Sequence, residues 1–166
     1  MSSMIGGGRL VRLDALTPQR WKNGGGVTSE IACFPPGADW KNFDWRVSRA
    51  IIEKDGAFSV FPGMLRWILL LEGNGFTLSF ADREKLHVTE RFAVESFPGD
   101  GITHCTLNGG PSVVLNVIAR ADMLMRVNVT TSRAPLPSLG HALIAEAGVS
   151  VRLDEQTVLH AATGIR

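Results

Sequence analysis

Short segments in which apolar and polar residues alternate dominate this chain, and turns rich in glycine and proline separate them. A period of two is typical of β-strands that bury one face, and closely spaced strands of this kind favour a barrel or sandwich over βαβ units. The sequence therefore predicts an all-β fold, with only residues 139–147 as a candidate helix. The alternating segments are residues 27–34, 45–52, 67–71, 76–80 and 113–118, and the turns between them include PPGAD, EKDG, FPGM, EGNG, FPGDG and NGGP.

The composition of the sequence changes after about residue 125. The connection SRAPLPSLGHA carries proline, glycine and serine, and the segment VSVRLDEQTVLHA beyond it reads as one more weak hairpin. With 166 residues, of which 45% are apolar, the chain is long enough for one domain with a core. We therefore expect a main barrel over residues 9–124 and a smaller β-rich annex over residues 125–166.

Charge, hydropathy and cysteine content exclude several classes of protein. A formal net charge of +1 predicts no basic face for nucleic acid. The longest apolar run, residues 67–71, is far shorter than the ~18 residues of a membrane span, and no leader pattern precedes it. Cys33 and Cys105 are too few for a disulfide scaffold and are expected to be small buried residues. These features predict a soluble, cytoplasmic protein without membrane or nucleic-acid partners.

The run RWKNGGGVTS places three glycines, residues 24–26, directly before a predicted strand. No GK[ST] sequence follows and the next element is a strand, so this is not a phosphate-binding P-loop. Such glycines allow a backbone to approach another group closely. We expect Lys22 and Asn23 to face that group, with Trp21 as a wall of a pocket, although a tight turn or bulge would explain the glycines equally.

Polar side chains interrupt several of the apolar strands. Thr28 shares a face with Glu30, and Arg46 shares a face with Ser48, because alternate residues of a strand point the same way. An unpaired buried polar group costs roughly 1–3 kcal/mol, so each requires a partner. One explanation is mutual pairing, with Glu30 bound to an arginine and an amide tying a loop; the other is a polar pocket in a barrel mouth.

Taken together, these side chains favour the pocket, and three cations against one carboxylate make it positive. A positive pocket suits an anion, most simply a carboxylate gripped by a guanidinium. The candidate ligand-binding residues are Trp21, Lys22, Asn23, Thr28, Glu30, Arg46, Ser48, Arg66 and Asn116.

The sequence resembles the bacterial HutD/Ves family. The resemblance is carried by WKNGGGVTSEIA, FDWRVSRAIIEKDGAFSVFPGMLRWILLLEGNG, FPGDG and LNVIAR, and it covers roughly residues 10–120. It implies a cupin-like (RmlC-like) jelly-roll β-barrel, of bicupin type with a reduced second barrel and without established enzyme activity. It also implies a regulatory role in histidine utilisation through an intermediate such as formylglutamate, whereas the Ves branch is linked to stress. Cupin-like proteins often dimerise, so a homodimer is an alternative to a monomer.

Metal-binding cupins share the pattern HxH, then Glu, then Gly, and this pattern can be laid on the chain. With the glycine at Gly73, Arg66 takes the Glu position, and the histidine pair falls on Ser59 and Phe61, or on Val60 and Pro62. None of these side chains is a usual ligand of a first-row metal. His104 lies near the place of a cupin's last histidine ligand, but its spacing after the FPG turn is wrong. We therefore expect no metal and no cofactor.

The leading functional hypothesis is a metal-independent protein that binds a small anionic metabolite. Two alternatives stay open: a metal-independent enzyme acting on a small carboxylate with Glu30 as general base, and a stress-related interaction protein. Neighbouring cations would make Glu30 a weaker base, which argues against the first alternative. No catalytic residue is therefore assigned.

Overall fold

The computed structural model describes residues 3–5, 8–131, 141–145, 148–153 and 157–163, which form strands joined by turns and one 3₁₀ turn, η1 (Leu13–Ala15). The strands are β1 (Ser3–Ile5), β2 (Gly8–Arg12), β3 (Pro18–Arg20), β4 (Gly26–Phe34), β5 (Trp45–Ile52), β6 (Gly56–Ala57), β7 (Met64–Glu72), β8 (Phe76–Phe80), β9 (Leu86–Val88), β10 (Val94–Pro98), β11 (Thr103–Leu107), β12 (Ser112–Arg120), β13 (Met125–Thr131), β14 (His141–Ala145), β15 (Gly148–Arg152) and β16 (Thr157–Thr163).

The strands expected from alternation are all present, so the all-β prediction is confirmed. The expected helix at residues 139–147 is wrong, because its described part, His141–Ala145, is strand β14 paired with β2 and β15. Its remaining residues lie outside the described ones. An apolar segment this short carries no periodicity that separates helix from strand, and here pairing with strands on both sides decides the outcome.

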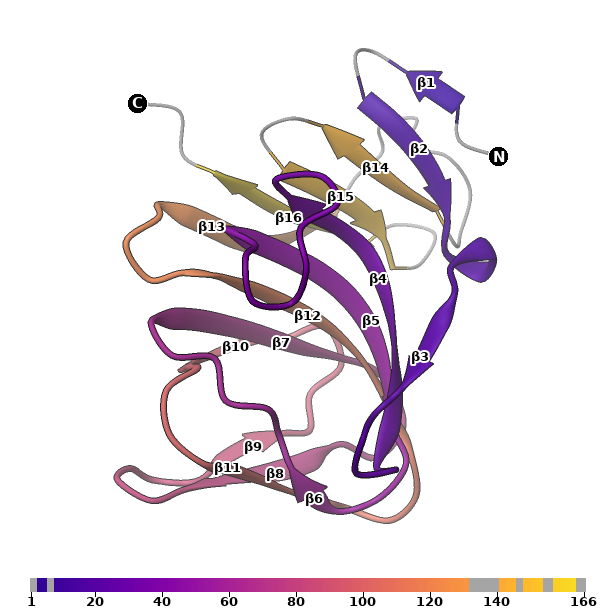
Figure 1. The fold of residues 1–166 in the computed structure, drawn as a ribbon. Coiled ribbons are helices and arrows are strands. Elements are labelled where there is room, and N and C mark those ends of the chain that lie inside the picture. The colour runs from indigo at the N-terminus through magenta and orange to yellow at the C-terminus, as the bar shows by residue number, and fades with distance from the viewer. Residues whose placement is uncertain (1–2, 6–7, 132–140, 146–147, 154–156, 164–166) are drawn as a thin grey trace.

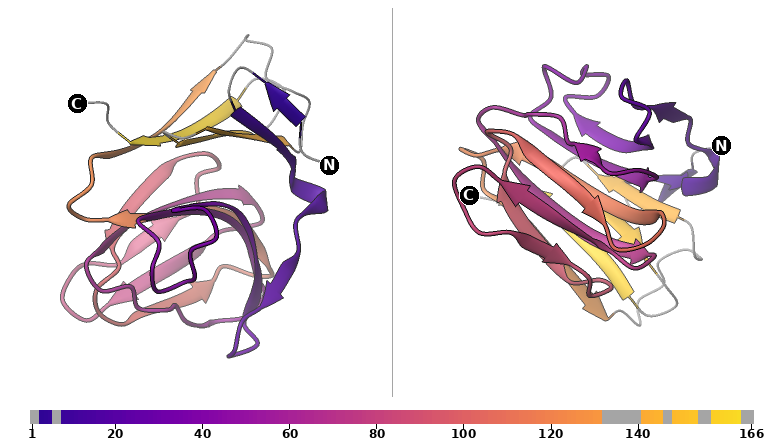
Figure 2. Two further views of the ribbon diagram at one scale, coloured as in Figure 1. Left: turned by 45° about the horizontal axis from the view of Figure 1, so that its top comes forward. Right: turned by 90° about the horizontal axis from the view of Figure 1, so that it is seen from below.

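The strands form three sheets that stack as layers (Figures 1 and 2). The central sheet has the order β10-β7-β12-β5-β4-β3, and the short sheet β6-β11-β8-β9 faces one side of it. The C-terminal sheet, with the order β1-β2-β14-β15-β16-β13, covers the other side. The central sheet is therefore covered on both faces, which suits its long apolar strands.

Two apolar cores hold these layers together. Between the central and C-terminal sheets, Val47 and Val117 pack with Leu159 of β16. Between the central and short sheets, Ile68 packs with Phe76 of β8. Side chains of this kind each stabilise the fold by about 1.5–3 kcal/mol when fully buried.

The C-terminal sheet is built from both ends of the chain. Strand β2, near the N-terminus, pairs antiparallel with β14, and the expectation that this sheet is a reduced second barrel stays a prediction. The division at residue 125 stays a prediction, although the pairing places residues 8–12 with the annex strands. The sheet ends at β1 and β13, and dimerisation through such an edge also stays a prediction.

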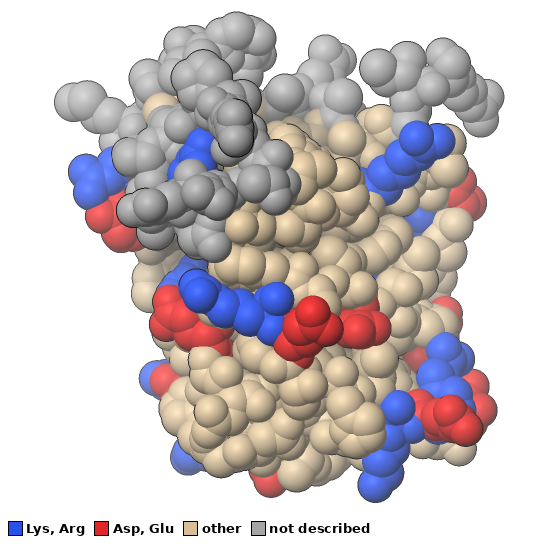
Figure 3. All heavy atoms as spheres, turned by 180° about the vertical axis from the view of Figure 1, so that it is seen from behind, with Lys and Arg blue, Asp and Glu red and all other residues tan. Residues whose placement is uncertain are grey.

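The face seen in Figure 3 carries acidic and basic side chains beside one another, with a broad uncharged area below them. Charges of both signs therefore offset each other locally on this face. Among the described residues no helix is long and apolar enough to cross a membrane.

Candidate functional site

A cavity of about 460 Å³ opens on the side of the central sheet that faces the short sheet. Its walls come from strands β3, β4, β5, β6, β7 and β12, from the turn before β4, and from the segments that precede β5 and β7. The lining residues are Gln19, Arg20, Trp21, Lys22, Asn23, Thr28, Trp40, Arg46, Ser48, Ala50, Ile52, Ala57, Phe58, Ser59, Phe61, Arg66, Val114, Asn116 and Ile118.

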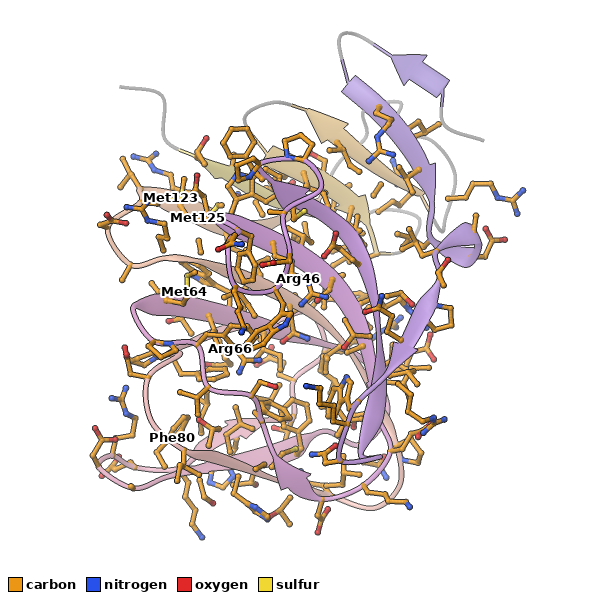
Figure 4. The ribbon with its side chains drawn as sticks, in the orientation of Figure 1. Arg46, Met64, Arg66, Phe80, Met123 and Met125 are labelled. Atoms are coloured by element: carbon orange, nitrogen blue, oxygen red, sulfur yellow. The ribbon has the colours of Figure 1, made fainter. Side chains whose placement is uncertain are left out.

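Strand register brings the polar side chains of the central sheet together. Ile118 of β12 lies between Arg46 of β5 and Arg66 of β7, so one cross-strand row presents two guanidinium groups to the cavity. In the adjacent row Ser48 lies opposite Asn116. Figure 4 shows Arg46 and Arg66 close together in the interior of the barrel. Residues far apart in the sequence therefore share one concave surface.

The three glycines form a tight turn that closes one wall of the cavity. The Trp21 N–H donates to the Gly26 carbonyl at 2.9 Å, and the Gly25 N–H donates to Asn23 Oδ1 at 2.9 Å. A Cβ on Gly26 would lie 2.3 Å from the Ile51 carbonyl oxygen, so only glycine fits beside strand β5. The close approach expected of the glycines is therefore to the protein's own backbone.

Trp21 is fixed against this turn as a wall of the cavity. Its indole Nε1 donates to Thr28 Oγ1 at 2.7 Å, and its ring meets that of Phe58 edge-on at 6.1 Å. The nearby Asn23 donates its amide to the Ala57 carbonyl at 3.3 Å. These contacts leave Trp21 and Thr28 with little freedom to move, so this wall is formed in advance of any ligand.

Arg66 is the most unusual residue of the cavity. Its side chain is buried, with 7% of the residue exposed, and no carboxylate of the described residues pairs with it. Its Nη1 donates to the Ser59 carbonyl at 3.3 Å, while its Nε is buried without a hydrogen-bond partner among the described residues. Burial lowers the pKa of Arg66 to about 10, because water that would stabilise its charge is excluded.

Aromatic rings supply the remaining contacts of this guanidinium. Its Cζ lies 5.0 Å from the ring centroid of Phe97, 5.3 Å from that of Phe58 and 5.4 Å from that of Phe61. Such cation–π contacts offset part of the desolvation cost but neutralise none of the charge. The cavity wall therefore holds a pre-positioned cation whose hydrogen-bonding capacity is incompletely used.

Arg46 is the second guanidinium of the row, and it has a carboxylate partner. Its Nε donates to Glu30 Oε2 at 2.9 Å. Glu30 itself is exposed and does not line the cavity, which separates it from the other candidate residues. The expected pairing of Glu30 with an arginine is thus found. A general base would have to act inside the cavity, whereas the paired carboxylate of Glu30 lies outside it.

Asn116 carries a second unsatisfied polar group. Its Oδ1 is buried and has no hydrogen-bond partner among the described residues. Ser48, opposite it, is also buried, with 4% exposed. A buried carbonyl without a donor costs about 1–3 kcal/mol, so the cavity offers an unused acceptor as well as an unused donor.

Comparison with known proteins identifies the group to which this architecture belongs. A family model described as HutD matches residues 14–163. The chain belongs to the HutD family. Protein Ves from Citrobacter koseri is 42% identical over 103 residues, covering 61% of this chain and 52% of that protein, and Protein Ves from Escherichia fergusonii is 39% identical over the same shares. The chain thus spans about half the length of these curated relatives.

Solved structures show the same fold. HutD from Pseudomonas fluorescens SBW25 aligns with a TM-score of 0.74 at 24% identity, covering 94% of this chain and 98% of that one. A conserved protein of unknown function from Pseudomonas aeruginosa PAO1 aligns with a TM-score of 0.72 at 25% identity, covering 94% and 92%. The HutD-family fold, a cupin-like jelly roll, is therefore confirmed for this chain.

The cavity of this HutD-family chain does not fit a metal ion. Where metal-binding cupins carry their ligands, Ser59, Phe61 and Arg66 all line the cavity, whereas Val60 is exposed. The lining includes no histidine, cysteine or carboxylate side chain, and the described residues contain no cluster of such ligands elsewhere. A guanidinium in place of a carboxylate repels a cation, so this donor set suits an anion.

Other residues singled out in the sequence lie away from the cavity. His104 is on the exposed side of β11, opposite Ala57 and Ser79. Cys105 is buried as expected, and burial raises the pKa of its thiol to about 12, so it stays protonated. Cys33 is only half-buried, and its thiol lies 3.6 Å from the Pro35 carbonyl.

Several lining residues were not predicted from the sequence of this HutD-family chain. Gln19 and Arg20 belong to the short edge strand β3, while Trp40, Phe58 and Phe61 lie in connecting segments. Connecting segments have no periodicity from which a facing direction could be read. The spacing pattern of metal-binding cupins was the one signal that pointed to Phe61.

Proposed function

We propose that this chain binds a small anionic metabolite in the cavity, without a metal, and that Arg66 is the principal contact of the anion. The observation that carries this proposal is a buried guanidinium with an unused donor and no carboxylate partner among the described residues. A ligand carboxylate would supply the missing countercharge, and a charge-assisted hydrogen bond is roughly twice as strong as a neutral one. The desolvation penalty of the buried Arg66 guanidinium is offset fully only when an anion binds to it.

The other polar groups would orient the ligand. Asn116 Oδ1 needs a donor, which an amide N–H or hydroxyl of the ligand would provide. Lys22 is exposed and lines the cavity, so it adds positive charge at the opening. Arg46, held by Glu30, adds a second guanidinium beside the first.

We place this binding activity in the regulation of histidine utilisation, in the cytoplasm, with formylglutamate as the candidate ligand. Support comes from membership of the HutD family and from the donors and acceptor of the cavity. One solved HutD structure, from Pseudomonas fluorescens, is described under a formate condition, and formate is the smallest carboxylate. An acyl-amino acid such as formylglutamate combines carboxylates with an amide N–H.

Thermal unfolding of ligand-free protein tests the proposal. A ligand at a hundred times its Kd adds about 2.7 kcal/mol of stability, which raises Tm by roughly 5–10 °C for a chain of this size. We expect such a shift with formylglutamate and a smaller one with formate. The matched control is the amide derivative of each acid, which lacks the charge and should give no shift. Absence of a shift with every acid, in protein shown by native mass spectrometry to be empty, would favour an interaction protein instead.

Anion affinity should also depend on pH in the alkaline range. Because burial lowers the pKa of Arg66 to about 10, the guanidinium is charged below that pH and begins to lose its proton above it. A bound anion stabilises the charged form, so affinity should be constant between pH 7 and 9 and fall above pH 10, approaching tenfold per pH unit.

Isothermal titration with formylglutamate between pH 7 and 11 measures this dependence, with circular dichroism to show that the protein stays folded. Lys22→Met removes the exposed cation and should still show the fall in affinity above pH 10. A flat profile up to pH 11 in folded protein would mean that Arg66 does not hold the anion.

A further inference from the structure

Trp40 is an exposed aromatic side chain at the edge of the cavity. It lies in the connection between β4 and β5 and lines the cavity, yet 57% of the residue is exposed. Its ring has the Lys41 ammonium beside it, with Nζ 5.0 Å from the ring centroid. A large indole in contact with water gains no free energy from burial. A ligand in the adjacent cavity could cover it and so supply that stabilisation.

The connection that carries Trp40 is anchored at its base. The Asp44 N–H donates to the Phe34 carbonyl at 2.6 Å, and the Lys41 N–H donates to Asp39 Oδ1 at 2.9 Å. Phe43 is buried, with 2% exposed, and its ring centroid lies 6.1 Å from that of Phe61. The indole is therefore held at the cavity by an ordered segment.

Phe61 links this segment to the anion site. The same ring that packs on Phe43 lies 5.4 Å from the guanidinium of Arg66. The cavity wall thus runs from Arg66, across Phe61, to the segment that carries Trp40. Other walls of the cavity, including Trp21, Phe58 and Ile118, are also apolar.

The size of the cavity bears on what it holds. At about 460 Å³ it is within the range of small-molecule sites, and a single liquid water occupies only about 30 Å³. A bare carboxylate on Arg66 would therefore fill a small part of the space. The apolar wall beyond Arg66 would stay wet with such a ligand.

We infer that Trp40 is a ligand-binding residue, and that the ligand is a carboxylate with an apolar body that extends from Arg66 to the indole. This inference rests on the proposed anion site, and it favours an acid with an apolar body over formylglutamate, which is polar at each end. An acid with an apolar body buries the indole and the aromatic wall, whereas a short acid that is polar at each end leaves Trp40 in water.

Titration of the ligand-free full chain with acetate, butyrate and hexanoate tests the inference, with formylglutamate as a polar comparison. Affinity in the wild-type protein should rise about fourfold for each buried methylene. In Trp40→Ala the affinity for hexanoate should fall about tenfold, while that for acetate stays within twofold; Trp40→Phe should lie between. Ile102→Ala is the matched control, because Ile102 is 71% exposed and does not line the cavity.

The outcomes separate this inference from the proposed function. Equal affinity for acetate and hexanoate, or hexanoate binding unchanged in Trp40→Ala, would overturn the role of Trp40 and leave the anion site standing. Binding of none of these acids, formylglutamate included, would overturn both. Retained acetate binding shows that each variant is folded.

Discussion

Replacing Arg66 with methionine should abolish anion binding and make the ligand-free protein more stable. Methionine keeps most of the length of the side chain and its packing against the phenylalanine rings, but carries no charge. Removing one partner of a buried, hydrogen-bonded charge pair costs about 2–5 kcal/mol of binding free energy, so affinity for a carboxylate should fall by roughly thirtyfold to several thousandfold.

The gain in stability comes from the same burial. Arg66 is 7% exposed, lacks a carboxylate partner among the described residues, and has a pKa lowered to about 10 by desolvation. An apolar side chain of similar volume avoids this penalty, and replacements of buried ion pairs by apolar side chains in other proteins are often neutral or stabilising by about 1–4 kcal/mol. Because methionine cannot replace the cation–π attraction of the guanidinium, we expect a gain of about 1 kcal/mol, read from urea unfolding of protein freed of ligand.

Arg49→Met is the control for charge. Arg49 lies on the same strand as Arg46 but on the opposite face, outside the cavity. The Arg49→Met variant should bind carboxylates with wild-type affinity. That result would show that net charge alone does not determine affinity. Wild-type affinity in Arg66→Met would refute the anion site, and a large loss of stability would mean that this guanidinium serves the fold rather than a ligand.

Local alternation predicted part of the cavity from the sequence. Thr28, Ser48 and Asn116 lie on three different strands, and a period of two gives the face of its own strand that each side chain occupies before any pairing is known. Strand register then brings Ser48 opposite Asn116, which alternation alone could not give. The face that a side chain occupies follows from its own strand, whereas the side chains that it meets across the sheet depend on which strands pair.

Alternation also failed at particular residues for physical reasons. Glu30 shares a face with Thr28 and lies opposite Ser48, but its carboxylate is exposed, pairs with Arg46 and lies outside the cavity. A period of two gives the face of a strand on which a side chain lies, but not how far along that face the cavity extends. Trp40 lies in a connection without periodicity, so its place at the cavity depends on the folded path of the chain.

The pairing of β2 with β14 shows a second limit. The two strands are separated by nearly the whole chain, and each is only five residues long, so either could suit several partners. Long-range pairing of this kind is selected by the complete set of contacts and not by the local sequence. The family resemblance predicted the barrel, but only the structure shows where the N-terminal strand β2 pairs.

Substituting Gly26 with alanine should cost about 3 kcal/mol of unfolding free energy and lower Tm by roughly 6–12 °C. The added Cβ would lie 2.3 Å from the Ile51 carbonyl oxygen and 3.2 Å from the Trp21 ring. The first of these atoms is backbone within the sheet, so relief requires strand β4 to move away from β5. That movement would also displace Trp21 from Thr28, its hydrogen-bond partner in the cavity wall, and weaken ligand binding in the protein that remains folded.

Gly24→Asn is the matched test within the same three glycines. Gly24 has a φ of +69°, and no described atom lies within 4 Å of the position that a Cβ would take there. Asparagine tolerates this left-handed region better than other side chains. The cost of this substitution should therefore stay near ~1 kcal/mol, with the cavity intact. If the two substitutions destabilised the protein equally, backbone conformation in the turn, and not the approach of Gly26 to strand β5, would explain why the chain keeps three glycines beside Trp21.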